Sequence, residues 1–125
     1  MFAIGIIAQF EAAHRLKGDF GPASRLHGHT YRVEVEVTGQ NLQPDGTLVD
    51  IGTLRPWVDE TVAGLNYQNL DELPAFADLN TTAEAVAAYI WRSLASRLSG
   101  YGLANLSVRL WESPQVYAAC SGALG

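Results

Sequence analysis

Residues 30–39 carry the pattern that most restricts the fold of this chain. Aromatic or β-branched residues occupy the odd positions from 31 to 37, and polar residues occupy the even positions. Alternation with a period of two is typical of a β-strand that has one face against a core and the other in water or in a subunit interface. We therefore expect a strand here, with its odd-numbered side chains on the buried face.

The same strand is preceded by a His-x-His pair. If the strand extends back to residue 27, His27 and His29 share one face of the sheet and their imidazoles can bind one ion. The third histidine of the chain, His14, comes after another expected strand, and it can complete the set if the two strands are neighbours. Three neutral imidazoles with an open fourth position are typical of a catalytic zinc site. Spacing alone leaves open the alternative that these histidines are ordinary polar surface residues.

Two further strand signals flank this pattern. β-branched and aromatic residues indicate a first strand over residues 2–10, and residues 106–112 alternate as a last strand. The sequence Pro-Asp-Gly at 44–46 is typical of a turn. We therefore expect residues 47–50 to return antiparallel to the strand at 30–39 as a hairpin.

Two helices are expected between these strands. Apolar spacing predicts a first helix over residues 52–63, ended by Gly64. Residues 81–84 have the spacing of a capping box at the start of a second helix, which would end before Ser99 and Gly100. Residues 65–80 form a connection without strong periodicity. Antiparallel strands with helices on one face make a small α+β fold.

Composition narrows the class of protein. The 125 residues fit one domain, and a charged content of only 17% indicates that some apolar surface is buried between subunits. A net charge of -5, with Lys17 as the only lysine, argues against a nucleic-acid-binding protein. No apolar run is long enough to cross a bilayer, and residues 1–10 lack the basic flank of a signal peptide, so we expect a cytoplasmic protein without membrane partners. The single cysteine, Cys120, cannot form an internal disulfide.

Five short segments occur in the order and spacing of one known family. They are Phe-Glu-Ala-Ala-His-Arg-Leu at 10–16, Leu-His-Gly-His at 26–29, Val-Asp-Ile at 49–51, Asn-Thr-Thr-Ala-Glu at 80–84 and Trp-Glu-Ser at 111–113. Over nearly its full length the chain resembles the 6-pyruvoyl-tetrahydropterin synthase and 6-carboxytetrahydropterin synthase family. The resemblance implies a T-fold over residues 1–125, in which an antiparallel sheet with two helices assembles into an oligomeric barrel. It also implies a homo-oligomer, a trimer or a hexamer of stacked trimers, with sites at the subunit interfaces.

The resemblance also implies a site. Zinc would be held by His14, His27 and His29, and Glu112 would anchor the ring of a reduced pterin. A carboxylate that faces two parallel ring donors can accept from both at once, although Glu112 on its own looks like a solvated strand end. Further ring contacts are expected at three positions near the start of the second helix: Thr81, Thr82 and Glu84.

The chain departs from the family where protons are exchanged with substrate. The usual members carry a cysteine four residues before the first histidine of His-Gly-His, where this chain has Ala23. The usual members also carry an Asp-His pair where this chain has Asn66 and Tyr67, and no glutamate replaces the cysteine within residues 20–26. The resemblance therefore implies that the binding residues are kept while the usual proton carriers are lost.

Three residues are candidates for the missing acid or base: Lys17, Tyr67 and Tyr117. A nearby positive charge favours the deprotonated form of a lysine or a tyrosine. The structural alternative is a solvent-exposed charge for the lysine and packing for the two tyrosines. Cys120 lies among small residues, and we expect an inert thiol there.

Together these features predict a zinc-dependent lyase that acts on the C6 side chain of a reduced pterin. Carbon–carbon cleavage of the retro-aldol type needs one modest base, whereas elimination of triphosphate with proton shifts needs two or more. Two alternatives stay open. One is a non-catalytic pterin-binding protein, and the other is an ordinary synthase that acts on dihydroneopterin triphosphate through substituted residues.

Overall fold

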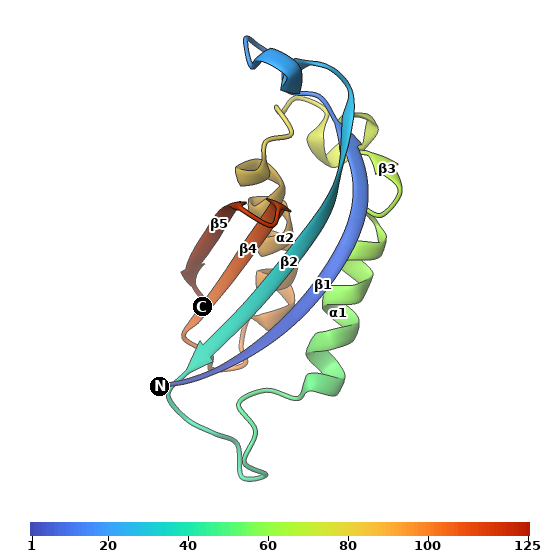
Figure 1. Cartoon of the computed structure of the whole chain (residues 1–125). Coiled ribbons are helices and arrows are strands. Elements are labelled where there is room, and N and C mark those ends of the chain that lie inside the picture. The colour runs from blue at the N-terminus through green and yellow to red at the C-terminus, as the bar shows by residue number, and fades with distance from the viewer.

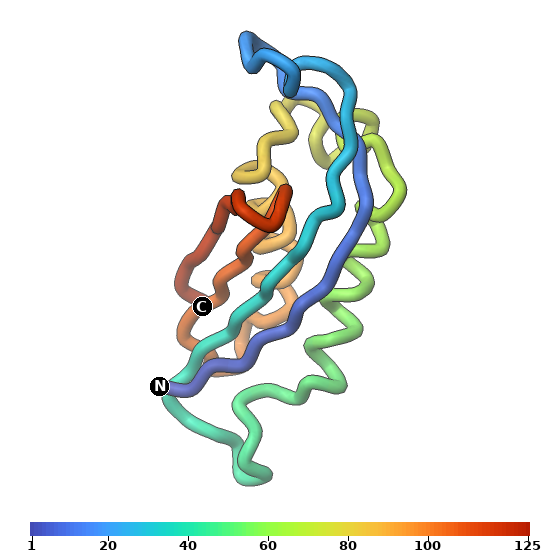
Figure 2. Tube along the Cα trace, in the orientation of Figure 1, coloured from blue at the N-terminus to red at the C-terminus, as the bar shows by residue number.

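Two long strands form the centre of the molecule. A computed structural model describes all residues 1–125, and in it β1 (Phe2–His14) pairs antiparallel with β2 (His27–Gly39) along their whole length. The two strands curve together across the molecule, and at the end that carries residues 14–27 the pair extends past the strands formed by residues 105–123 (Figures 1 and 2). This pairing sets His14 directly opposite His27.

Three further strands complete a five-stranded sheet with the order β3-β1-β2-β4-β5. Strand β4 (Asn105–Ser113) pairs antiparallel with β2, and β5 (Val116–Ala123) pairs antiparallel with β4 through a register shift near Ser113. Strand β3 (Gln68–Asn69) is only two residues long and pairs parallel with β1. The sheet is therefore antiparallel except at this short edge strand.

Two helices cover one face of the sheet, and the opposite face is left open (Figure 1). They are α1 (Ile51–Ala63) and α2 (Ala83–Leu98). The odd-numbered residues of β2 from Tyr31 to Val37 are buried against them, as their alternation predicts, within one core cluster of 25 residues. The α+β arrangement expected from the sequence is confirmed. No helix of the structure has both the length and the apolar character that a membrane span requires.

Short 3-10 turns occupy the connections on either side of the β1–β2 end. They are η1 (Gly21–Ser24), η2 (Leu70–Glu72) and η3 (Pro74–Phe76). Turns η2 and η3 lie within the connection between α1 and α2. This connection reaches the end of the sheet where the histidines are, so it contributes to their surroundings.

The expected hairpin at 47–50 is wrong. Residues 40–50 form a loop that leads directly into α1. The turn itself exists, because the Gly46 amide donates to the main-chain oxygen of Gln43. Leu48 and Val49 are buried in the core instead of pairing as a strand, and Asp50 accepts from the Gly52 amide as the N-cap of α1. Core burial and helix capping therefore occupy the residues that were expected to pair.

Two other element boundaries differ from the sequence prediction. The small residues around Cys120, at 118–122, were not expected to form an element, and they lie within the edge strand β5. The N-cap of α2 is Thr82, whose hydroxyl accepts from the Ala85 amide, so a capping box that starts at Thr81 is wrong by one residue. The Thr81 hydroxyl instead donates to Asp71.

Candidate metal centre and binding cavity

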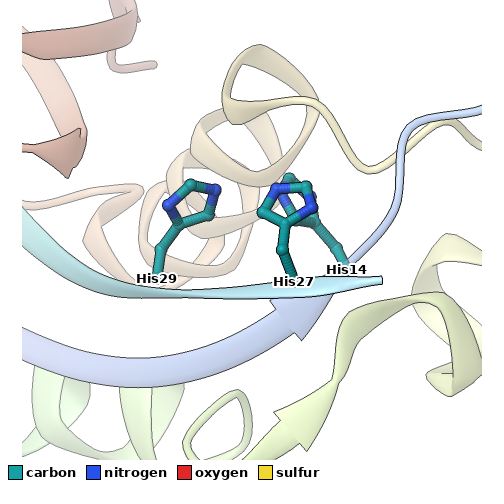
Figure 3. Close-up of side chains that lie close together, drawn as sticks. All are labelled: His14, His27 and His29. Atoms are coloured by element: carbon teal, nitrogen blue, oxygen red, sulfur yellow. The ribbon is translucent and has the colours of Figure 1, made fainter. Parts of the chain in front are cut away.

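Three imidazoles meet at the free end of the β1–β2 pair. His14 is the last residue of β1, and His27 and His29 lie on the same face at the start of β2 (Figure 3). The ligand nitrogens of the three rings all lie within 4.8 Å of one another. His14 is 1% exposed, and the other two rings are half-buried. The alternation of side chains along paired strands produces this convergence.

Main-chain oxygens orient two of these rings. The His14 Nδ1 lies 2.7 Å from the Thr81 oxygen, and the His27 Nδ1 lies 2.7 Å from the Arg25 oxygen. A carbonyl oxygen can only accept a hydrogen bond, so each Nδ1 carries the proton and leaves the Nε2 lone pair free. Metal-binding histidines typically donate their second ring nitrogen in this way. The donor set and its orientation therefore fit a zinc ion bound by three neutral imidazoles.

The surroundings of His29 favour its neutral form. Burial lowers the pKa of His29, because desolvation disfavours the charged ring. The carboxylate of Glu112 acts in the opposite direction, and the positive forms of His14 and His27 act in the same direction as burial. The net shift is downward, so His29 is available as a neutral ligand near pH 7.

Glu112 lies beside the histidine cluster at the end of β4. The carboxylate is half-buried, and its negative charge acts to raise the pKa of both His29 and the buried Tyr31. It lines a cavity of about 380 Å³ that also includes Glu84, Tyr117 and the start of α2. The structure therefore brings Glu84, from the start of α2, into one cavity with Glu112 and Tyr117 from the other end of the chain.

Comparison with known proteins identifies the family. The model of the family described as 6-pyruvoyl tetrahydropterin synthase matches residues 3–123. The chain belongs to the 6-pyruvoyl tetrahydropterin synthase family. This confirms the family resemblance inferred from the five sequence segments.

Relatives and a solved structure agree with this membership. The human 6-pyruvoyl tetrahydrobiopterin synthase is 39% identical over 99 residues, which cover 68% of each chain. The 6-carboxy-5,6,7,8-tetrahydropterin synthase of Haemophilus influenzae is 31% identical, covering 91% of this chain and 94% of the relative. The Caenorhabditis elegans 6-pyruvoyl tetrahydropterin synthase structure superposes with a TM-score of 0.84 at 25% identity, covering 97% of this chain and 95% of the other. The T-fold expected from the sequence is confirmed.

Two residues that the family resemblance assigned to the pterin ring are engaged within the chain. The Thr81 side chain is fully buried, and its hydroxyl lies 2.8 Å from an Asp71 oxygen. The Thr82 hydroxyl accepts from the Ala85 amide at the start of α2. Glu84 is exposed, and it lines the same cavity as Glu112.

The structure also places the residues at which the family resemblance implies lost proton carriers. Ala23 lies within turn η1, in the loop that joins β1 to β2. The Asn66 side-chain oxygen accepts from the Glu11 amide at 2.9 Å, which ties that side chain to β1. Tyr67 is 81% exposed and has a positive φ of 58°. With His29 it lines a second cavity, of about 470 Å³, at the sheet edge.

The other two acid or base candidates also have partners. The Lys17 ammonium donates to the main-chain oxygen of Leu79 at 3.2 Å, and this lysine is exposed. Tyr117 is 47% exposed, and the Arg109 guanidinium lies 4.5 Å from its ring centroid. Of the three candidates, only Tyr117 shares a cavity with Glu112.

Sequence reasoning missed two residues near the histidines. Asp71 accepts from the Thr81 hydroxyl and from the Arg15 amide, although no motif or periodicity marks it. Tyr31 was expected on the buried face, but its hydroxyl is buried without a hydrogen-bond partner, which the sequence did not reveal. Burial raises the pKa of Tyr31, and the charges of Glu112 and Asp71 raise it further.

Proposed function

We propose that this chain is a zinc-dependent lyase that breaks a carbon–carbon bond in the C6 side chain of a reduced pterin. The observation that carries the proposal is the convergence of His14, His27 and His29 beside Glu112, in a member of the 6-pyruvoyl tetrahydropterin synthase family. The relatives named as 6-pyruvoyl and 6-carboxy tetrahydropterin synthases support a reduced pterin as the ring system.

The three histidines would hold the ion through their Nε2 atoms. Main-chain acceptors already fix the Nδ1 atoms of His14 and His27, so those rings need little reorganisation to bind an ion. Zinc bound there would polarise an oxygen of the pterin side chain and stabilise negative charge that develops on it.

Glu112 would hold the ring. Its carboxylate can accept two parallel N–H donors from a pterin, and charge-assisted pairs of this kind are strong and directional. Because the charge of Glu112 is close enough to affect the pKa of His29, a ring bound to this carboxylate would lie next to the histidine cluster. Glu84 and Tyr117 line the same cavity and would contact the ring or its substituents.

Carbon–carbon cleavage suits a chain with few proton carriers. A base takes the proton from a side-chain hydroxyl, and the O–H electron pair becomes the C=O bond of the departing aldehyde. The adjacent carbon–carbon bond breaks, its electron pair moves toward the C6=N5 bond of a dihydropterin, and the same group returns the proton to carbon. One acid–base residue is sufficient for this sequence of steps. Tyr117 is our first candidate because it shares a cavity with Glu112, and Tyr67 and Lys17 are the alternatives.

A non-catalytic pterin-binding protein is the second candidate function. Two features favour it: residue 23 is an alanine where the family resemblance implies a cysteine, and the Asn66 side chain accepts from the Glu11 amide. In addition, the Lys17 ammonium already donates to the Leu79 oxygen. In that case the cavity would bind the ring without turnover.

The two functions are separated by incubating the zinc-loaded protein with dihydroneopterin. We expect 6-hydroxymethyl-dihydropterin and glycolaldehyde, detected by chromatography with fluorescence. Pterin binding without product would instead support the non-catalytic alternative. Release of inorganic triphosphate from dihydroneopterin triphosphate would indicate the ordinary synthase reaction.

We expect Glu112→Gln to weaken pterin binding by about 10- to 100-fold, because one strong charge-assisted acceptor is lost. Cys120→Ser is the control and should leave turnover unchanged.

A further inference from the structure

Asp71 connects two segments that lie next to His14 in the structure, one at Arg15 and the other at Thr81. One of its carboxylate oxygens lies 2.8 Å from the Thr81 hydroxyl, and the other lies 2.9 Å from the Arg15 amide. Arg15 comes directly after His14 in the chain, and Thr81 immediately precedes the N-cap of α2. A single half-buried side chain in turn η2 therefore ties the end of β1 to the start of a helix.

Thr81, which is bonded to Asp71, also contacts the imidazole of His14. Its main-chain oxygen lies 2.7 Å from the His14 Nδ1, and both residues are almost completely buried. The Thr81 hydroxyl lies 3.4 Å from the same nitrogen. A hydroxyl has one proton, and here it is donated to Asp71, so the hydroxyl cannot also donate to the ring. The imidazole must then donate from Nδ1, and the lone pair for a ligand is left on Nε2.

His14 and His27 differ in the sequence distance to the main-chain oxygen that each ring contacts. The acceptor for His27 is the Arg25 oxygen, two residues away, so local chain geometry is enough to place it. The acceptor for His14 is 67 residues away in sequence, and it is placed only if the connection between α1 and α2 folds against β1. Asn80 bonds to the Lys17 main chain farther from the ring, and the two hydrogen bonds of Asp71 join the segments at Arg15 and Thr81, the residues next to His14 and its acceptor.

We propose that Asp71 is a positioning residue for the metal centre, acting through Thr81 to hold His14 with its Nε2 presented to the ion. The inference rests on the zinc site of the proposed function. A carboxylate suits this role better than an amide. Both of its oxygens accept, whereas an asparagine would present an NH₂ group toward either the Arg15 amide or the Thr81 hydroxyl. Groups that orient metal ligands in this way typically contribute about 10- to 100-fold to metal affinity.

The test compares zinc affinity among variants of the full chain by competition with a chelator. We expect Asp71→Asn to bind zinc about 10- to 100-fold more weakly than the unmodified protein. Glu72→Gln is the matched control, because it removes one exposed negative charge from the same turn without touching Thr81 or Arg15, and it should keep full affinity. Visible absorption after cobalt substitution gives a second readout, since Asp71→Asn should change the spectrum of the bound ion.

A second pair of variants covers the case in which Asp71→Asn fails to fold. Thr81→Ser keeps the hydroxyl that Asp71 accepts from and should keep zinc affinity, whereas Thr81→Val removes it and should lose as much affinity as Asp71→Asn. Equal affinity in Thr81→Val and Thr81→Ser, or full affinity in folded Asp71→Asn, would overturn the inference.

Failure of the metal site itself is distinguishable from failure of this inference. If the unmodified protein bound no zinc, or if His14→Ala bound zinc as tightly as the unmodified protein, the zinc site would be wrong and the role of Asp71 would fall with it. If His14→Ala abolished binding while Asp71→Asn and Thr81→Val did not weaken it, only the role of Asp71 would be wrong.

Discussion

Tyr31 has an unusual environment for a buried tyrosine. Its ring is fully buried and stacks on Phe10, with centroids 4.8 Å apart and planes 12° apart. Its hydroxyl has no hydrogen-bond partner, although His29 and Glu112 are close by. Most buried polar groups in folded proteins are hydrogen-bonded, so this hydroxyl is desolvated without compensation.

We expect Tyr31→Phe to leave the free energy of unfolding unchanged or to raise it by about 1 kcal/mol. The substitution keeps the stacked ring and removes only a donor without a partner. Urea unfolding of the metal-free protein measures the change. Tyr31→Ala is the control for the ring and should cost about 3–5 kcal/mol by leaving a cavity. A loss of more than about 1 kcal/mol in Tyr31→Phe would mean that the hydroxyl has a bonding partner after all.

Among single residues, the sequence predicted the site residues that lie on periodic strands. It missed the residue whose contacts form only when an aperiodic connection folds back onto the sheet. The histidines were expected to meet because residues 27 and 29 alternate along one strand, and the register of two long strands then brings His14 opposite His27. Asp71 could not be found in this way. Its contacts with Thr81 and Arg15 exist only because an aperiodic connection folds back onto the end of β1.

Among the elements, the loop at 40–50 shows how a correct turn signal led to a wrong strand. The Gly46 amide closes the turn onto Gln43, and Gly46 has a φ of 87°, which suits glycine. Burial determines the path of the chain after the turn, because Leu48 and Val49 pack into the core. Turn residues indicate a change of direction, but they do not specify which segments pair.

The same loop gives a prediction about pH. The Thr47 hydroxyl and amide both donate to Asp45, and these hydrogen bonds lower the pKa of Asp45 below its ordinary value of 3.8. The folded state then binds fewer protons than the unfolded state in this range, so stability rises with pH there. The contribution of Asp45 is therefore present above pH 3.8 and is lost as the pH falls through the lowered pKa.

We expect Thr47→Ala to move the pKa of Asp45 up toward its ordinary value, because the side-chain donor is the largest cause of the shift. NMR titration of the Asp45 carboxyl carbon measures this directly, and urea unfolding between about pH 2 and pH 6 should show a weaker acid dependence. In an Asp45→Asn background the threonine substitution should have no effect on the acid dependence. An unchanged pKa in Thr47→Ala would contradict the assignment.

For the molecule as a whole, the alternation at 30–39 and the two helix signals were sufficient to predict the α+β class and the helices on one face. Strand β5 (Val116–Ala123) was missed because most of its residues are small and show no clear apolar alternation. It is a strand because β4 offers a free edge and a tight connection at Ser113. Pairing with a neighbour, and not intrinsic preference, determines this element.

Both outer edges of the sheet are poorly protected in the single chain. Strand β3 covers β1 only at Ala12 and Ala13, so most of β1 has a free edge, and β5 has a free edge along its length. Neither residues 2–10 nor residues 116–123 contain a charged residue. Exposed edge strands usually carry charges, prolines or bulges that prevent further pairing. These two edges therefore favour pairing between copies, in keeping with the homo-oligomer expected from the family resemblance.

We expect the full chain to sediment at about three or six times the 13.5 kDa of one chain. The double variant Ser121→Lys with Ala123→Lys places two lysines on β5. Its sedimenting mass should shift toward that of one chain at micromolar concentration, because added charge opposes pairing at an edge strand. Both positions are exposed and lie on the same face of β5. Ser96→Lys with Ser99→Lys, at exposed positions near the end of α2, adds the same charge away from the edges and should leave the mass unchanged. An equal loss of assembly in both double variants would point to net charge as the cause, whereas full assembly of the β5 variant would show that copies associate through another surface.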